Sequence, residues 1–289
     1  MQVRTAVIPA AGLGTRFYPA TKAVPKELLP IIDVPALQFV MDEAVAAGID
    51  HIVLVSNRAK PAIEAYVEPR PEVVAKVRSS GREELADRLD RIGKDVRISI
   101  TYQDEPRGLG HAVGCAREAV GDEPFAVLLP DELMSSPSLL DSMARLLETT
   151  GGGVVALKQV PREDVSRYGV VTPSGPLADG VLPISDVVEK PAIEDAPSEY
   201  IIIGRYVLTP DVFGHIAELK PGAIGELQLT DALRVQAAAG PFHGVLSDVG
   251  RHDTGTPLGW LTAVVDIALD DPTIGADFRA FLSARSAEY

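Results

Sequence analysis

The sequence predicts an α/β fold with a mixed, mainly parallel central sheet flanked by helices. Short apolar runs of strand length alternate with longer segments whose apolar residues recur at helical spacing. Several of the apolar runs end on glycine-rich or acidic loops, as expected where the carboxyl ends of parallel strands form a ligand site. With 289 residues and 46% hydrophobic composition, the chain can build this sheet as a single domain.

The first half of the chain, residues 1–150, has the clearest alternation. Strands are predicted at 5–9, 51–56, 96–102 and 125–129, and helices at 35–47, 109–120 and 138–149. Residues 60–93 interrupt this order with Glu, Arg and Ala at helical spacing, which predicts a solvated helical insertion.

The second half, residues 151–255, contains shorter strands separated by turn residues. They are predicted at 153–160, 168–172, 184–189 and 200–208, and we expect them to extend the same sheet. Residues 256–289 are predicted to form C-terminal helices that serve packing or oligomerisation. The whole chain, 1–289, is therefore expected to be one domain.

Composition restricts the partners. A formal net charge of −14 argues against nucleic acid and anionic membranes, because both repel an acidic surface. The single cysteine, Cys115, cannot form an internal disulfide, and in its apolar context it is more typical of a buried, inert thiol. No export segment or run of 18 apolar residues is present. We expect a cytoplasmic protein whose partners are small molecules.

The first motif is a small-residue loop that follows the strand at 5–9 and includes Ala10, Ala11, Gly12 and Gly14. Exposed backbone N–H groups, the guanidinium of Arg16 and the ammonium of Lys26 are suited to binding a polyphosphate. A dinucleotide fingerprint is excluded because Phe17 stands where its third glycine belongs. Taken alone, the G-x-G of this loop is more typical of an ordinary strand-to-helix turn than of a phosphate site.

The residues that follow this loop favour a nucleotide-binding loop over an ordinary turn. G-x-G-T-R at 12–16 with P-K-E-L-L-P at 25–30 resembles the sugar-phosphate nucleotidyltransferases. The resemblance implies a Rossmann-like, glycosyltransferase-A-like fold, a loop that holds the nucleotide, and neutralisation of its triphosphate by Arg16 and Lys26. R-x-x-x-A-I-E-x-Y at 58–66, followed by a helical stretch, resembles the bacterial UTP–glucose-1-phosphate uridylyltransferases. That resemblance implies UTP and glucose 1-phosphate as substrates.

A second motif, Y-Q-D-E-P-R-G-L-G-H at 102–111, offers groups for a nucleotide base. The Gln103 amide can pair with a pyrimidine edge, and Gly108 lets a planar base lie against the backbone. The resemblance implies that both residues contact the base. A lone histidine such as His111 is more typical of a structural role, at a helix start or a phosphate, than of acid–base catalysis.

Two acidic motifs are candidates for metal binding. Asp131 follows the strand at 125–129, where a carboxylate can bind Mg²⁺ or can simply cap the next helix. The resemblance implies that Asp131 binds Mg²⁺. Asp253, at a strand-like end in R-H-D-T-G-T, is a candidate for the second ligand. The D-T-G-T form is more typical of thymidylyltransferases, so transfer from dTTP remains an alternative.

V-V-E-K-P at 187–191 is the candidate sugar motif. Adjacent residues of a strand point to opposite faces unless the proline ends the strand there, and in isolation this pair could be surface charge. The resemblance implies that Glu189 accepts hydrogen bonds from hexose hydroxyls and that Lys190 holds the sugar phosphate. It also implies that Gly169 and Gly204 allow close approach of the sugar ring.

These motifs predict direct in-line attack of the sugar phosphate on the nucleotide, because no serine, histidine and acid set for covalent catalysis is evident. Arg16, Lys26, Asp131 and Lys190 are the expected catalytic residues. A catalytically silent regulatory relative is the other alternative. We expect a homodimer or homotetramer, and an architectural role in capping and packing for G-E-L-Q-L-T-D-A at 225–232.

Overall fold

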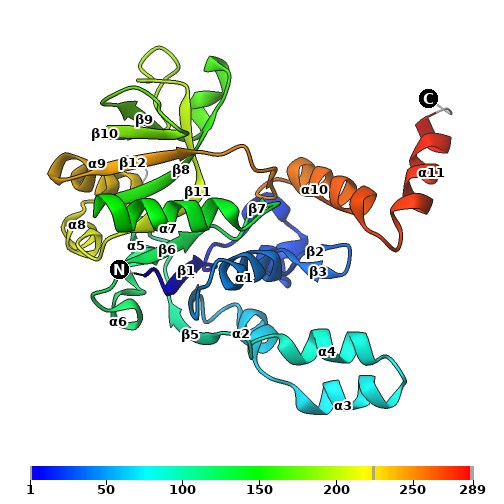
Figure 1. Ribbon diagram of the computed structural model, residues 1–289. Helices are drawn as coiled ribbons and strands as arrows, with labels where there is room; N and C mark the ends of the chain where they lie inside the picture. The colour runs from blue at the N-terminus through cyan, green and yellow to red at the C-terminus, as the bar shows by residue number, and fades with distance from the viewer. Residues whose placement is uncertain (1, 223–224, 287–289) are drawn as a thin grey trace.

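The computed structural model describes residues 2–222 and 225–286. At its centre lies a nine-stranded mixed sheet with the order β5-β4-β1-β6-β11-β8-β12-β10-β9 (Figure 1). Its strands are β1 (Thr5–Pro9), β4 (His51–Ser56), β5 (Arg97–Tyr102), β6 (Phe125–Leu128), β8 (Gly153–Gln159), β9 (Gly169–Pro173), β10 (Val181–Glu189), β11 (Tyr200–Leu208) and β12 (Phe242–Leu246). Two small ladders pair β2 (Pro30–Ile31) with β3 (Val34–Pro35) and β7 (Glu132–Met134) with β13 (Arg251–Asp253).

The predicted mixed sheet is confirmed, and its parallel part is concentrated in the first half of the chain. Strands β5, β4, β1 and β6 run parallel to one another. Strand β11 then pairs antiparallel with both β6 and β8, and only β8 and β12 form a further parallel pair within the sheet as described. The carboxyl ends of β1, β4, β5 and β6 therefore meet at one edge, where the predicted nucleotide motifs begin.

Helices cover both faces of the sheet and produce three layers. The α-helices of the described residues are α1 (Ala36–Ala46), α2 (Pro61–Val67), α3 (Pro71–Ser79), α4 (Glu83–Arg91), α5 (Leu109–Gly114), α6 (Arg117–Val120), α7 (Ser138–Thr150), α8 (Val212–Glu218), α9 (Leu229–Ala239), α10 (Pro257–Asp270) and α11 (Gly275–Ser286). Successive strand residues alternate between faces: Ile8 packs in the core beneath α1, α2 and α7, and Val7 in the core beneath α5, α8 and α9.

The helix predicted at 109–120 is wrong as one element, because it divides into α5 and α6. The Cys115 carbonyl, at the break, accepts a hydrogen bond of 2.9 Å from the Thr101 hydroxyl on β5. This contact, between residues distant in sequence, coincides with the change of direction, and helical periodicity alone does not reveal it.

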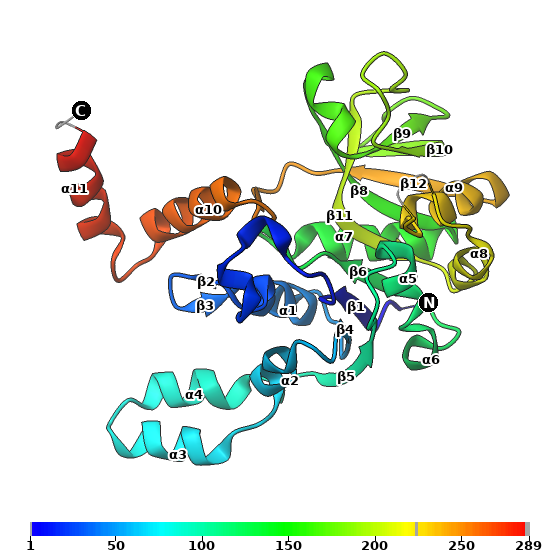
Figure 2. The same cartoon turned by 180° about the vertical axis from the view of Figure 1, so that it is seen from behind.

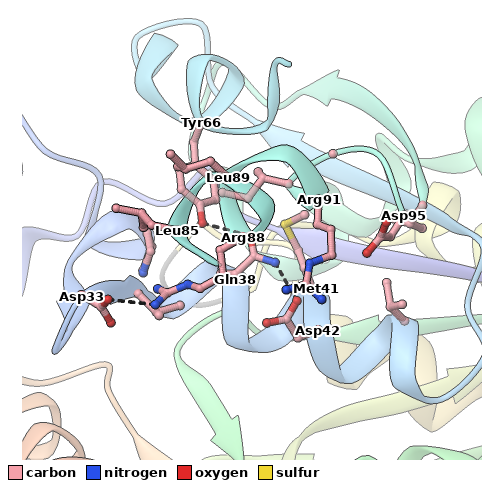
Figure 3. Close-up of a pocket in the computed structure, with 16 residues that line it drawn as sticks. Asp33, Gln38, Met41, Asp42, Tyr66, Leu85, Arg88, Leu89, Arg91 and Asp95 are labelled. Atoms are coloured by element: carbon pink, nitrogen blue, oxygen red, sulfur yellow. Dashed lines mark hydrogen bonds and ion pairs between the residues drawn. The ribbon is translucent and has the colours of Figure 1, made fainter. Parts of the chain in front are cut away.

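The predicted insertion contains α2, α3 and α4, and the α3–α4 pair extends away from the sheet (Figures 1 and 2). A hollow of about 620 Å³ lies between α1 and α4. Two hydrogen bonds join the insertion to the body across this hollow: Arg88 Nη1 to Asp33 Oδ2 at 3.0 Å and Tyr66 Oη to Gln38 Oε1 at 2.9 Å (Figure 3). No predicted site residue lines the hollow.

The C-terminal helices α10 and α11 extend away from the sheet on the same side of the view as α3 and α4, and lie above them (Figure 2). Trp260 and Ala263 of α10 pack against the core. Leu258 and Leu261 of the same helix are 76% and 52% exposed, and Phe281 of α11 is 56% exposed. Residues 287–289 of the predicted C-terminal segment lie outside the described residues. None of the described helices has the length and apolar character needed to cross a membrane.

Candidate active site

The loop after β1 is the starting point of the site. The Ala10 N–H donates to the Val55 carbonyl on β4 at 2.8 Å, so the parallel ladder continues into the loop. Ala10 and Ala11 are buried, whereas a Cβ added to Gly12 would meet nothing within 4 Å. The backbone at Gly12 is therefore open to a ligand. Gly14 has a φ of 63°, a conformation that favours glycine.

The cationic residues of this motif line a small hollow. It has a volume of about 230 Å³ and is lined by Gly14, Thr15, Arg16, Phe17, Lys26 and Gly255. The Lys26 ammonium lies 2.6 Å from Asp131 Oδ2, and Arg16 Nη1 donates to the Gly255 carbonyl at 3.4 Å. The structure thus brings three motifs together that are separated by more than one hundred residues in the chain.

The electrostatics of this cluster keep both Lys26 and Asp131 charged. Burial by itself lowers the pKa of Lys26, but the carboxylates of Asp131 and Glu27 outweigh it, so the pKa is raised. Burial likewise raises the pKa of Asp131, but the Lys26 ammonium outweighs it and lowers the pKa. Asp131 is therefore ionised at neutral pH, the state that binds a cation.

Asp131 and Asp253 face the same space. The Thr254 N–H donates to the Asp131 carbonyl at 2.7 Å, which fixes the segment of β13 beside the end of β6. A Cβ built on Gly255 would lie 3.0 Å from Asp253 Oδ1 and 3.1 Å from Asp131 Oδ2. A glycine at 255 therefore keeps the space between the two carboxylates open.

The donor set suits Mg²⁺. Among the described residues, no group of three or more His, Cys, Asp and Glu side chains is placed to hold a metal. Mg²⁺ is bound through one or two carboxylates, with water and substrate phosphates as its other ligands. A pair of carboxylates beside a hollow lined by Arg16 and Lys26 fits this ion.

Glu132, next to Asp131, has a different partner. Arg251 donates two hydrogen bonds of 2.6 Å to its carboxylate. Burial raises the pKa of Glu132 to about 7, against the lowering effect of Arg251. The Arg251 guanidinium also lies 5.6 Å from the centre of the Tyr168 ring. Glu132 therefore joins β7 and β13 to the segment before β9.

Gln103 begins the predicted base site. Its main-chain N–H donates to the Ser56 carbonyl at 2.8 Å, and its side chain is buried. Gly108 has a φ of 100°, and a Cβ there would lie 2.6 Å from the Leu227 carbonyl oxygen. Glycine at 108 is thus required by the packing of residues 226–228, and its contact with a base stays a prediction.

The segment at 225–232 packs as expected but does not cap its helix. The Leu227 N–H donates to the Arg107 carbonyl at 2.7 Å, and the Gly110 N–H donates to the Leu227 carbonyl at 2.8 Å. No side-chain cap forms at the start of α9, so the capping part of the prediction is wrong. Instead, the Thr230 hydroxyl reaches into the predicted sugar site.

Glu189 and Lys190 lie together rather than on opposite faces. Strand β10 ends at Glu189, and Lys190 turns the chain with a φ of 43° before Pro191. The Lys190 ammonium then lies 3.4 Å from Glu189 Oε1, and the Thr230 hydroxyl donates to Glu189 Oε2 at 2.7 Å. A Cβ at Gly169, paired with Glu189 in the sheet, would lie 3.4 Å from Oε2.

Strand β11 connects the two ends of the site. Gly204 lies in a bulge of this strand with a φ of 67°, and a Cβ there would lie 2.7 Å from Glu132 Cγ. Two residues on, Tyr206 is buried. Burial raises its pKa, and the negative charges of Glu189, Glu132 and Asp131 raise it further. Carboxylates of the sugar motif and of the metal motif therefore both act on one buried phenol.

The sequence analysis missed Glu27 and Lys60. The Lys60 ammonium donates to Glu27 Oε2 at 2.9 Å and to the Ala10 carbonyl at 2.8 Å. Both side chains are buried, so this pair joins the start of the insertion to the nucleotide loop. The sequence offered one signal for this pair. Glu27 stands at the start of the apolar stretch E-L-L-P, and a buried carboxylate is usually paired with a cation.

The sequence analysis assigned no role to Arg205, which follows Gly204 in the chain. Its guanidinium is fully buried and binds the Glu43 carboxylate of α1 through two hydrogen bonds of 2.9 and 2.7 Å. It also donates to the carbonyls of Leu129, Gly204 and Glu132. A single arginine thus ties α1 to the turn that carries Asp131.

Comparison with known proteins agrees with this arrangement. A sequence model of the nucleotidyl transferase family matches residues 5–268. The chain belongs to this family. It is 43% identical over 282 residues to the UTP–glucose-1-phosphate uridylyltransferase YngB of Bacillus subtilis, covering 97% of this chain and 95% of that protein.

Solved structures give the same result for nearly the whole chain. A UTP-bound UGPase from Acinetobacter baumannii superposes with a TM-score of 0.89 at 34% identity, covering 97% of this chain and 98% of that one. A UDP-glucose pyrophosphorylase complexed with UDP-glucose superposes with a TM-score of 0.85 at 38% identity, covering 93% and 100%.

Proposed function

We propose that this member of the nucleotidyl transferase family transfers a uridylyl group from UTP to glucose 1-phosphate, which gives UDP-glucose and pyrophosphate. The observation that carries the proposal is that Arg16 and Lys26 line one small hollow while the carboxylates of Asp131 and Asp253 lie beside it, next to Lys26 and Gly255. The charges of Asp131 and of Glu189 in the E-K-P motif both act on the buried Tyr206, so the two motifs are near each other. The relatives named for UTP and UDP-glucose support the choice of nucleotide and sugar.

The chain supplies positive charge at the nucleotide end. The open backbone at Gly12 approaches the nucleotide, and Arg16 and Lys26 neutralise the triphosphate. Asp131 and Asp253 would hold Mg²⁺, which when bound supplies further positive charge to phosphate oxygens. These groups offset the repulsion between two anionic substrates, which is the main barrier to bringing them together.

The sugar end supplies the nucleophile. Lys190 binds the phosphate of the sugar, and Glu189, held by the Thr230 hydroxyl, accepts hydrogen bonds from sugar hydroxyls. A phosphate oxygen of glucose 1-phosphate attacks the α-phosphorus of UTP in line with the leaving group. The bond from the α-phosphorus to the bridging oxygen breaks, and its electron pair leaves with pyrophosphate.

The two ends of the site correspond to two halves of one domain. Residues 1–150 provide the nucleotide half, residues 151–255 the sugar half, and the last helices follow from residue 256. Both halves share the nine-stranded sheet, and the same two layers of core residues run beneath them.

Pyrophosphate release tests the proposed function directly. The full-length protein is assayed with Mg²⁺ and glucose 1-phosphate, with UTP and dTTP in parallel reactions. The proposal expects greater kcat/KM with UTP than with dTTP. The reverse order would identify a thymidylyltransferase, and no turnover with either nucleotide would identify a catalytically silent relative.

Replacement of Lys190 by alanine is expected to act on one substrate. It should lower kcat/KM for glucose 1-phosphate by about 10²-fold, because a phosphate loses its charged hydrogen-bond partner. The KM for UTP should stay close to that of the wild type. Initial rates over both substrate concentrations measure the two effects, with Lys76→Ala, an exposed lysine on α3, as the control. A rise in the KM for UTP alone would place Lys190 on the nucleotide instead.

We further propose that the protein is a cytoplasmic homodimer or homotetramer in which a second copy covers the exposed side chains of α10 and α11. The single free cysteine suits a reducing compartment. The double substitution of Leu258 and Leu261 by glutamate is expected to reduce the mass measured by light scattering, because charge cannot be buried unpaired in an apolar interface. Leu177→Glu, at an exposed leucine outside these helices, is the control. An unchanged mass in the double variant would place the interface elsewhere.

A further inference from the structure

The orientation of the Gln103 amide is fixed by its own contacts. Its nitrogen, Nε2, lies 2.9 Å from the Gly108 carbonyl oxygen and 2.9 Å from His111 Nδ1. A carbonyl oxygen only accepts hydrogen bonds, so the atom that faces Gly108 must be the amide nitrogen. Rotation of the amide by 180° would place two acceptors against each other.

His111 takes the second hydrogen of this amide. Because Gln103 donates to Nδ1, the ring proton must reside on Nε2, which lies 4.0 Å from Cys115 Sγ. Burial and the neighbouring Arg107 lower the pKa of His111, and burial raises the pKa of the Cys115 thiol. The imidazole is therefore neutral near pH 7, and its contacts are consistent with a single tautomer.

Only an acceptor remains on Gln103 for a ligand. Both hydrogens of its amide are used, and Gln103 Oε1 takes part in no hydrogen bond within residues 2–222 and 225–286. Uracil presents the N3–H donor on its pairing edge, whereas cytosine presents an unprotonated N3 there, which is an acceptor. A fixed acceptor in the protein therefore complements uracil and repels cytosine at the same position.

We propose that His111 is a positioning residue that holds the Gln103 amide with its oxygen toward the base and thereby selects uracil over cytosine. The inference rests on the proposed function, because it takes Gln103 as the residue that meets the base. It accounts for a histidine that contacts neither the predicted metal ligands nor the sugar motif. Without an acceptor at position 111, the Gly108 carbonyl alone holds the amide, so the rotated amide, which turns its nitrogen toward a cytosine N3, costs one hydrogen bond less to reach.

Discrimination between UTP and CTP tests this role. The wild type, His111→Leu and His111→Gln are assayed for kcat/KM with each nucleotide at saturating glucose 1-phosphate and Mg²⁺. His111→Leu is expected to lower the UTP/CTP ratio about tenfold, the effect of one hydrogen bond. His111→Gln offers a carbonyl acceptor and is expected to stay within about threefold of the wild-type ratio. His243→Leu, at a half-buried histidine on β12, is the control and should keep the ratio.

Equal losses of kcat/KM for both nucleotides in His111→Leu, with an unchanged ratio, would overturn the inference, because a packing defect does not discriminate between bases. Calorimetric binding of UTP and CTP to the same variants separates this outcome from a failure of the proposed function. If the wild type binds UTP but does not turn over, the enzyme assignment fails. The role of His111 is then decided by the ratio of the binding constants for UTP and CTP, which should fall in His111→Leu and should not change if the substitution only disturbs packing.

Discussion

Replacement of Asp131 by alanine is expected to lower kcat by about 10²-fold or more. Asp131 faces the same space as Asp253 and lies beside the cationic hollow, so its loss removes one of two carboxylates available to Mg²⁺. It also leaves Lys26 without the partner that holds its ammonium in place. The Mg²⁺ concentration that gives half-maximal activity should rise as well, which separates loss of a metal ligand from loss of substrate binding.

Steady-state rates over a range of Mg²⁺ concentrations provide the measurement. Asp50→Ala is a matched control, since Asp50 also pairs with a basic side chain, Arg4, but lies beside the opposite end of β4. It should keep the wild-type kcat. A kcat for Asp131→Ala within a few-fold of the wild type, with unchanged Mg²⁺ dependence, would remove Asp131 from the metal site.

Replacement of Arg205 by methionine is expected to cost about 3–5 kcal/mol of unfolding free energy. The substitution leaves the Glu43 carboxylate buried without a counter-charge and removes the hydrogen bonds that Arg205 donates to three carbonyl groups. Because a domain is stable by only about 5–15 kcal/mol, this loss is a large part of the total. The turn that carries Asp131 also loses its connection to α1. Activity should therefore be lost at a lower temperature than that of global unfolding.

Urea-induced unfolding measures the effect, with Arg145→Ala as the control. Arg145 pairs with Asp141 on the exposed surface of α7, and surface pairs of this kind contribute at most about 1 kcal/mol. Adding Glu43→Leu to Arg205→Met should recover part of the lost stability, because the unpaired charge is removed. If Arg205→Met is no less stable than Arg145→Ala, the buried network does not support the fold.

Local features were readable from the sequence because each lies within one short segment. Strand β1, the loop at Gly12 and the carboxylate of Asp131 belong to continuous runs of polar and apolar residues, and the order of parallel strands brings them to one edge. The sequence left open whether Glu189 and Lys190 point to opposite faces of a continuing strand or whether the strand ends before Pro191. The structure resolves that choice, and the catalytic roles stay proposals.

Long-range pairs were not readable, because burial of a charge is decided by tertiary packing. Arg205 and Glu43 are 162 positions apart, and Lys60 and Glu27 are joined only after the insertion folds back on the loop. An arginine inside an apolar strand is a signal that some partner exists, but it does not say which one. Strand β7 was missed for a related reason, since a three-residue strand carries too little periodicity.

Helix α10 carries the sole tryptophan of the chain, Trp260. Its indole N–H is shielded from solvent without a hydrogen-bond partner among the described residues. Tryptophan fluorescence excited at the red edge of the absorption band therefore reports on this helix alone, because the nine strands of the sheet contain no tryptophan. A shift of the emission maximum to longer wavelength would show that α10 separates from the core before the rest of the molecule unfolds, and no external dye is needed.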